Sequence, residues 1–215
     1  MDELTAVQRI SVWILPVIFA ITLHEVAHGL VAKWLGDDTA ARLGRLSLNP
    51  LHHIDPIGTL LIPGILLVIG GFMFGWAKPV PVDFNRLRHP KRDMALVAVA
   101  GPLANFLMAV VWALTLRFAN GLDMDYIKTP LELMSVAGIV INVVLMILNL
   151  LPIPPLDGGR IAVGLLPHNL AEPFSRIEPY GFYILLALMA TGGLSVLLDG
   201  PMELVQSFLF SLAGN

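Results

Sequence analysis

Residues 10–35 read ISVWILPVIFAITLHEVAHGLVAKWL, an apolar stretch that carries His24, Glu25 and His28 near its centre. A run of about 20 apolar residues is long enough for a helix to cross a bilayer. Because hydrocarbon is a costly environment for ionisable side chains, those found within such a helix usually have a function. The stretch therefore predicts a membrane helix that carries a functional site.

The three ionisable residues form the pattern H-E-x-x-H. On a helix, His24 and His28 lie on one face and can bind one metal ion, while Glu25, about 100° round the helix, can face an adjoining water. The pattern is typical of a zinc site with a built-in base. The alternatives are a chance match and two packed histidines paired with a carboxylate, and the apolar surroundings favour the metal over both.

The composition of the 215-residue chain is that of a helical membrane protein that crosses the bilayer several times. Hydrophobic residues make up 56% and charged residues 13%, and the mean hydropathy is +0.78. Such values are typical of polytopic membrane proteins. Several spans leave no room for a separate soluble domain, so we expect residues 1–215 to form a single membrane-embedded domain.

Charge and cysteine content exclude several classes of function. The net charge of −3 and the absence of a basic cluster give no reason to expect nucleic acid as a partner. The absence of cysteine excludes disulfides, thiol catalysis and thiolate zinc ligands. The first residues, Met1-Asp2-Glu3, lack the positive region of a cleavable signal, so we expect the first apolar segment to remain in the mature protein.

Four segments are long and apolar enough to span a bilayer, namely residues 10–35, 94–116, 133–156 and 179–198. A fifth run, 57–77, is interrupted by Pro63-Gly64 and Gly70-Gly71, and predicts either a spanning helix or a re-entrant hairpin. We therefore expect an all-α polytopic protein with about four to six membrane helices or half-helices.

Residues 202–212 are too short to span. Asp199 as a possible N-cap and Pro201 at the start of the first turn indicate a short helix in or near the membrane interface.

The distribution of basic residues distinguishes between the two courses of residues 57–77, because Lys and Arg gather on the cytoplasmic side of short loops. If the run crosses, the two sides carry eight and five basic residues. If the run re-enters, the two sides carry ten and three basic residues, and the three are Arg9, Arg117 and Lys128. The stronger asymmetry favours the re-entrant course, which places the N-terminus outside and the active site toward the cytoplasmic side.

Two histidines leave a zinc site short of a ligand, since a catalytic zinc usually has three protein ligands and one water. Trp34 stands where the longer motif H-E-x-x-H-x-x-G-x-x-H has its last histidine. Asp37 and Asp38 follow the same helix, but beside Gly36 they are typical of a solvated turn. Asp157 is the better candidate.

Asp157 follows the charge-free residues 133–156 and precedes Gly158 and Gly159, which allow close backbone approach. In the re-entrant topology it reaches the depth of His24 and His28. The alternative makes Asp157 only an N-cap for the helix after Gly159.

Together these residues resemble the site-2 proteases, a family of intramembrane zinc metalloproteases. The H-E-x-x-H helix, the stretch GPLAN at 101–105 and the stretch NLLPIPPLDGG at 149–159 are similar to three signatures of that family, in the same order. The tracts LNPLHHIDP at 48–56 and GWAKPVPV at 75–82 resemble its compact prokaryotic subgroup. We see neither an inserted PDZ domain nor a C-terminal CBS domain, so regulation through such modules is not expected.

The resemblance implies that His24, His28 and Asp157 bind one Zn²⁺ per chain and that Glu25 is the catalytic base. The chemistry agrees with these roles, since zinc lowers the pKa of a bound water from about 15.7 toward 7. Glu25 can then take the proton and later deliver it to the leaving amine.

Three asparagines in the apolar segments are further candidates. The resemblance implies that Asn149 binds the substrate carbonyl or stabilises the oxyanion, and Asn105 also matches a family signature and is a candidate substrate-binding residue. Asn142 and Asn149 are seven residues apart on one helical face, so either could instead be ordinary interhelical hydrogen-bonding residues. We interpret Asn149 as functional and Asn142 as structural.

Prolines predict extended backbone in two places. Pro152, Pro154 and Pro155 cannot donate backbone hydrogen bonds, so their segment could line the zinc site and present carbonyls to an unwound substrate. Residues 72–82, which include Trp76, favour an edge strand or short β-hairpin near the cytoplasmic face. We expect the substrate to add to such an edge as a strand, near Trp76 and Pro152.

The predicted function is that of a zinc endopeptidase in the cell membrane that cuts a transmembrane segment of another protein, expected to be single-pass. The resemblance implies regulated intramembrane proteolysis. One alternative is a membrane metal-binding or transport protein, but the middle and last spans offer almost no ionisable path. An inert scaffold is disfavoured because Glu25 is present. His52 and His53 are assigned no ligand role.

Overall fold

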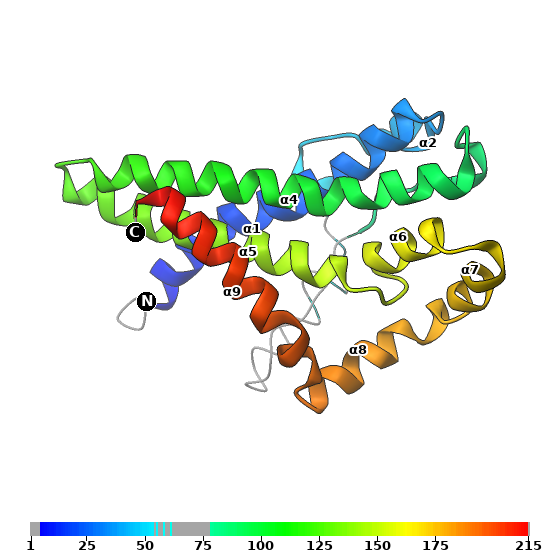
Figure 1. Cartoon of the computed structure of the whole chain (residues 1–215). Coiled ribbons are helices and arrows are strands. Elements are labelled where there is room, and N and C mark those ends of the chain that lie inside the picture. The colour runs from blue at the N-terminus through cyan, green and yellow to red at the C-terminus, as the bar shows by residue number, and fades with distance from the viewer. Residues whose placement is uncertain (1–4, 54, 56–57, 59–60, 62–77, 215) are drawn as a thin grey trace.

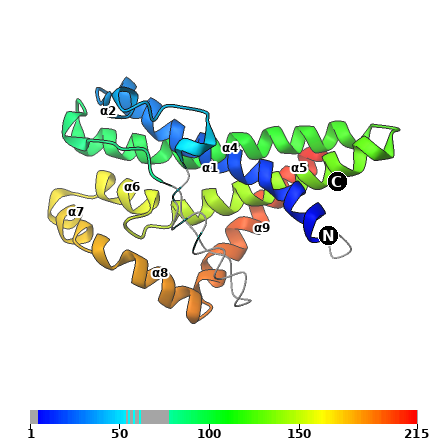
Figure 2. The ribbon, with the colours of Figure 1, turned by 180° about the vertical axis from the view of Figure 1, so that it is seen from behind.

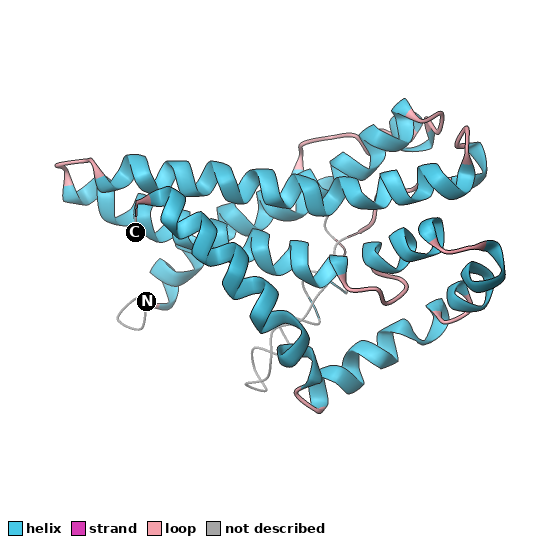
Figure 3. Cartoon of the chain, in the orientation of Figure 1, coloured by secondary structure: helices cyan, strands magenta, loops and turns pink. Residues whose placement is uncertain are grey.

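The structure, a computed structural model, describes residues 5–53, 55, 58, 61 and 78–214. Within these residues the regular structure is helical throughout, with no strand (Figure 3). Four of the described helices are long and apolar enough to cross a membrane, namely α1 (Ala6–Trp34), α4 (Pro90–Asn120), α5 (Asp125–Leu150) and α9 (Gly193–Ala213). The expected all-helical class with several membrane helices is confirmed.

The four long helices form an elongated bundle around the α4–α5 pair. α5 runs back along α4 after a short connection, α1 packs against both, and α9 packs against both from the other side (Figures 1 and 2). Both termini lie near the end of the bundle where α4 turns into α5 (Figure 1). The arrangement leaves one face of each outer helix open to the surroundings, as expected of helices in lipid.

Small side chains bring α4, α5 and α9 close together. Ala109 and Ala113 of α4 are fully buried, and a side chain at Gly138 of α5 would collide with the ring of Trp112. Without a hydrophobic driving force between helices in lipid, such small residues favour association because they permit close packing. The resulting core cluster consists of Ala109, Ala113, Leu116, Ile139, Val143, Leu209 and Ala213.

Shorter helices connect the long ones. They are α2 (Thr39–Arg42), the 3₁₀ turns η1 (Pro50–His52), η3 (Phe84–Arg86) and η4 (Glu178–Tyr180), α6 (Asp157–Leu165), α7 (His168–Ser175) and α8 (Gly181–Ala190). Of these, α6 packs on α4, where a Cβ at Gly164 would lie 2.6 Å from the Cβ of Ala95. This contact holds the end of α6 against the first turns of α4.

The end of α1 and the start of α4 lie side by side. The backbone N–H of Arg88 donates to the carbonyl of Leu35 across 3.0 Å, and Ala32, Leu87 and Val97 share a core cluster. The end of α1 and the start of α4 therefore lie at the same end of the bundle.

The last two helices differ from the prediction. The expected span 179–198 is broken, because α8 ends near Thr191 and Gly192 adopts a left-handed conformation at φ 74° that favours glycine at helix ends. α9 then runs uninterrupted through Pro201, which removes one backbone donor without ending the helix. The prediction that Asp199 caps a separate interfacial helix at 202–212 is therefore wrong.

The expected edge strand at 72–82 is not formed in the part that the structure describes, residues 78–82. These residues form neither a helix nor a strand. The N–H of Lys78 donates to the carbonyl of His53 at 2.9 Å and that of Val80 to Glu25 at 2.7 Å, while Pro79 and Pro81 have no N–H. The rest of the proposed hairpin and residues 62–77 of the proposed re-entrant run lie outside the described residues.

Asp37 does not belong to a solvated turn as predicted. It is fully buried, and its carboxylate accepts hydrogen bonds from the N–H groups of Thr39 at 3.0 Å and Asp83 at 2.7 Å. Asp38 alone is exposed, in an ion pair with Arg42. Asp37 thus ties the end of α1 to the segment that precedes α4, a contact between residues far apart in the sequence.

Candidate metal centre

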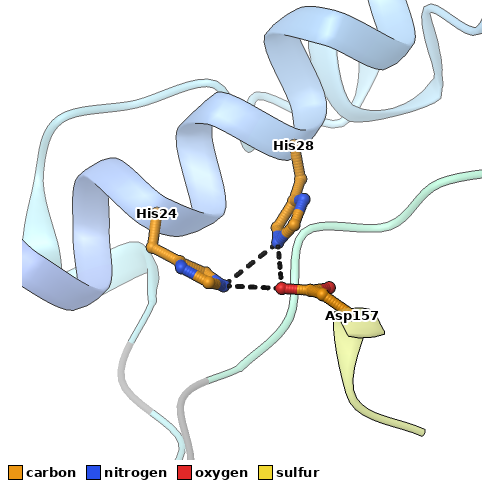
Figure 4. Close-up of side chains that lie close together, drawn as sticks. All are labelled: His24, His28 and Asp157. Carbon is orange, nitrogen blue, oxygen red and sulfur yellow. Dashed lines mark hydrogen bonds and ion pairs between the residues drawn. The ribbon is translucent and has the colours of Figure 1, made fainter. Parts of the chain in front are cut away.

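His24 and His28 lie one turn apart on α1 and point toward Asp157 at the start of α6 (Figure 4). The two Nε2 atoms are 3.1 Å apart, and each lies 3.3 Å from Oδ2 of Asp157. All three side chains are buried, with exposed fractions of 8%, 9% and 6%. The fold therefore gathers into one buried cluster the three residues that the sequence suggested as ligands.

Gly101 of α4 makes room for the two imidazoles. A Cβ at this position would lie 2.6 Å from Cε1 of His24 and would also collide with the ring of His28. Only glycine therefore allows α4 to approach this face of α1 while both rings keep their places.

Two further glycines place Asp157. A Cβ at Gly158 would collide with the carbonyl oxygens of Leu150 and Leu151, and one at Gly159 would lie 2.7 Å from Cα of Pro154. The predicted close backbone approach is thus confirmed, and it folds residues 151–156 back so that α6 begins beside α1.

Asp157 is not the N-cap of the following helix. Leu156 occupies the N-cap position, no side chain caps the helix, and Asp157 is its first residue. This leaves the carboxylate free to point toward the histidines.

The other ring nitrogen of each histidine is hydrogen-bonded. Nδ1 of His28 lies 2.7 Å from the carbonyl oxygen of Val97, which can only accept, and Nδ1 of His24 lies 2.6 Å from Oδ1 of Asn105. The Asn105 amide is oriented by its own Nδ2, which donates to the carbonyl of Ala20 at 3.2 Å. Both Nδ1 atoms therefore donate, and in the neutral rings each Nε2 carries a lone pair.

Three lone-pair atoms consequently converge on one point. Asp157 Oδ2 is buried and accepts no conventional hydrogen bond from the residues that the structure describes. Nitrogen ligands about 2.0–2.1 Å from a tetrahedral zinc lie roughly 3.3 Å apart. The distances of 3.1 to 3.3 Å between the three donor atoms match that spacing, and the donor set suits zinc.

Glu25 lies beside His24 on α1 but faces a different part of the protein. Its half-buried carboxylate accepts a hydrogen bond from the backbone N–H of Val80 at 2.7 Å. The Val80 side chain packs on the next turn of α1, because a Cβ at Gly29 would lie 2.8 Å from it. Arg45 holds the same segment by donating to the carbonyls of Lys78 and Pro79.

Asn149 and Pro152 lie at the joint between α5 and α6. Asn149 is half-buried, and its Nδ2 donates to the carbonyl of Leu145 at 2.9 Å. Pro152 is exposed in the loop that leads to Asp157.

The remaining candidates lie elsewhere. Asn105 is fully buried beneath His24, which separates it from any surface that a substrate could reach. Trp76 lies outside the described residues. Nε2 of His53 lies 2.8 Å from the carbonyl of Ser47, and His53 does not join the metal-binding group.

Comparisons with known proteins agree with this geometry. The family model for peptidase family M50 matches residues 122–192, which include Asp157. The chain is 41% identical over 181 residues to the protein named "Putative zinc metalloprotease YwhC" of Bacillus subtilis, covering 83% of this chain and 80% of that one.

This chain belongs to peptidase family M50. It is also 30% identical over 206 residues to "Putative zinc metalloprotease Rip2" of Mycolicibacterium smegmatis, covering 90% of this chain and 73% of the relative. The Rip2 protein of Mycobacterium tuberculosis matches at 30% over 199 residues, covering 91% and 71%. No solved structure matches the chain.

Membership of M50, the site-2 protease family, makes the protein a zinc metalloprotease with several membrane helices. The resemblance found in the sequence is thereby confirmed at the level of the family, and so is zinc as its cofactor.

The sequence alone did not reveal two residues that shape this M50 site. Gly101 stands in the stretch GPLAN, yet nothing in the sequence shows that its missing side chain faces the imidazoles. Asn142 was interpreted as structural. Its amide contacts Asn105 at 3.0 Å, and Asn105 in turn contacts His24. The spacing of Asn142 and Asn149 was the only available signal, and it does not show what either residue contacts.

Proposed function

We propose that this M50 peptidase is an intramembrane endopeptidase that hydrolyses a peptide bond in or near a transmembrane segment of another membrane protein. The observation that carries the proposal is the buried group of His24, His28 and Asp157 within apolar helices, with Glu25 adjacent. Such a group at membrane depth is costly unless it has a function.

We assign each residue a role from its chemistry and from the resemblance to the family. His24, His28 and Asp157 would hold the zinc ion, which when bound polarises a water and the scissile carbonyl. Glu25 takes the proton of the attacking water and delivers it to the leaving amine. The N–H of Val80 orients its carboxylate by donating a hydrogen bond to it.

Asn149 is proposed to bind the substrate carbonyl. Its Nδ2 carries two protons, and the bond to the carbonyl of Leu145 uses one of them. The residue lies at the end of α5, where the chain bends toward Asp157, so its second proton is available to a peptide bound there. Exposed Pro152 is proposed to border the path of that peptide.

The active site is proposed to lie toward the cytoplasm. Because α1 ends beside the start of α4 and α5 returns to the same end, ten basic residues gather at this end of the bundle and Arg9, Arg117 and Lys128 lie at the other. The richer side of a membrane protein is usually cytoplasmic. His28 lies six residues before the end of α1, or about 9 Å at roughly 1.5 Å per residue.

The substrate is proposed to be a single-pass membrane protein cut in regulated intramembrane proteolysis. Support comes from the site's burial among helices, since a substrate must approach through the membrane. The alternative of a metal-transporting protein is disfavoured by family membership and by the presence of Glu25.

The test uses purified full-length protein reconstituted in liposomes with a single-pass reporter. We expect wild type to cut the reporter, with mass spectrometry placing the cut in or next to the transmembrane segment, and Glu25→Gln to leave it intact. A cut confined to soluble parts of the reporter, or equal cleavage by Glu25→Gln, would contradict the proposal.

A further inference from the structure

Asn142 of α5 is the innermost member of a chain of hydrogen-bonded side chains that crosses the bundle. It is fully buried, and its Oδ1 accepts from Nδ2 of Asn105 at 3.0 Å. Its own Nδ2 donates to the carbonyl of Gly138 at 2.8 Å. Through Asn105 and His24 the chain joins α5, α4 and α1.

The direction of every bond in this chain is fixed by carbonyl groups that can only accept. Because Gly138 accepts from Asn142, the Asn142 side chain must present its oxygen to Asn105. Because Ala20 also accepts from Nδ2 of Asn105, the Asn105 side chain must present its oxygen to His24. The sequence of donors and acceptors thus ends with Nδ1–H on His24 and a lone pair on its Nε2.

We propose that Asn142 is a positioning residue for zinc, acting through Asn105 on the orientation of His24. The inference rests on the ligand set proposed above. It differs from ordinary helix packing, because it assigns to a residue of α5 an effect on a ligand carried by α1.

Burial makes the hydrogen bond between Asn142 and Asn105 important for the site. Asn105 and Asn142 are both fully buried, so no water can replace a lost partner without a rearrangement. Removing Asn142 leaves one Nδ2 proton of Asn105 unpaired, so that the carbonyl of Ala20 alone then holds the Asn105 amide in the orientation that serves His24. Residues that orient ligating histidines typically change metal affinity roughly 10–100-fold when mutated.

The experiment measures zinc affinity directly, by competition with a fluorescent zinc chelator, on the detergent-purified full chain. Wild type is compared with Asn142→Ala, Asn105→Ala and the double variant. We expect Asn105→Ala to weaken zinc binding roughly 10–100-fold and Asn142→Ala about tenfold. The double variant should bind as weakly as Asn105→Ala alone, because Asn142 acts through Asn105.

Ser135→Ala is the matched control. Ser135 lies seven residues before Asn142 on α5, is fully buried and has no hydrogen-bond partner for its hydroxyl among the described residues. We expect its substitution to leave zinc affinity unchanged. If Asn142→Ala does not fold, Asn142→Ser takes its place, since a serine hydroxyl can bond the carbonyl of Gly138 but is too short to reach Asn105.

The outcomes separate this inference from the ligand assignment. Wild-type zinc affinity in the Asn142 variant, or losses that add in the double variant, would overturn the role of Asn142. The ligand set itself is tested in parallel by His24→Ala, which should abolish zinc binding. Retention of zinc by His24→Ala would instead overturn the proposed site.

Discussion

The backbone N–H of Val80 donates to Oε2 of Glu25 across 2.7 Å, although the two residues are separated by more than 50 positions in the chain. The proposed catalytic base is thus joined to the segment 78–82, which Arg45 also holds by donating to the carbonyls of Lys78 and Pro79. This contact orients a carboxylate that would otherwise be free to rotate.

Replacing Val80 with proline should test this contact, because proline removes the donor in a segment that already contains Pro79 and Pro81. Hydrogen bonds to charged groups contribute about 1.5–3 kcal/mol, so we expect peptidase activity to fall roughly tenfold or more. Zinc content should not change. Val82→Pro is the control, because the structure shows no hydrogen bond from the N–H of Val82 within the described residues. Equal activity of Val80→Pro and Val82→Pro would argue against this role.

Gly101→Ala should damage the zinc site without removing a ligand. The added methyl would press on the imidazoles of both His24 and His28, and we expect zinc affinity to fall more than tenfold. Metal analysis of the purified variant gives the answer. Gly121→Ala at the other end of α4 should bind zinc normally, since a Cβ there meets only the carbonyl of Phe118 at 3.5 Å. Normal zinc affinity in Gly101→Ala would mean that the rings do not occupy the positions described.

Asp37→Ala should destabilise the protein by about 1–3 kcal/mol, because it leaves the part-buried N–H of Asp83 without its acceptor. Asp38→Ala is the matched control. Its carboxylate pairs with Arg42 and Arg86 on the surface, and exposed pairs contribute roughly 0–1 kcal/mol. Thermal unfolding in detergent compares the two variants. A larger loss for Asp38→Ala would contradict the assignment of Asp37 as the residue that ties α1 to the segment before α4.

The sequence was sufficient to predict the three donor groups of the site. His24 and His28 are joined by helical periodicity, and Asp157 stood out because it follows a long charge-free run and precedes two glycines. The contacts of Asn105 and Asn142 could not be predicted, because they depend on how α1, α4 and α5 rotate against one another. Periodicity along one helix does not determine that rotation.

The C-terminal region shows a second limit. A charge-free run indicates that a segment is apolar but not where a helix within it ends. Gly192, in its left-handed conformation, ends α8 inside the predicted span, and Pro201 is accommodated within α9. We had predicted a continuous span across position 192 and a helix start near Pro201, because either residue type can lie inside a membrane helix or at its end.

The absence of cysteine allows the orientation to be tested by single labels. Met124→Cys lies in the α4–α5 connection, and Leu165→Cys lies near the end of α6; both native side chains are exposed. With a membrane-impermeant thiol reagent on intact cells, we expect Met124→Cys to react and Leu165→Cys to react only after permeabilisation. The reverse pattern would place the basic end of the bundle outside.

The central claim is that His24, His28 and Asp157 hold the zinc and that Glu25 performs the proton transfers. It is tested most directly by measuring zinc content and cleavage of a transmembrane reporter together, for wild type, Glu25→Gln and Asp157→Ala. We expect one zinc per chain and cleavage in wild type, one zinc without cleavage in Glu25→Gln, and neither in Asp157→Ala. Full cleavage by Glu25→Gln, or one zinc per chain in Asp157→Ala, would contradict the account.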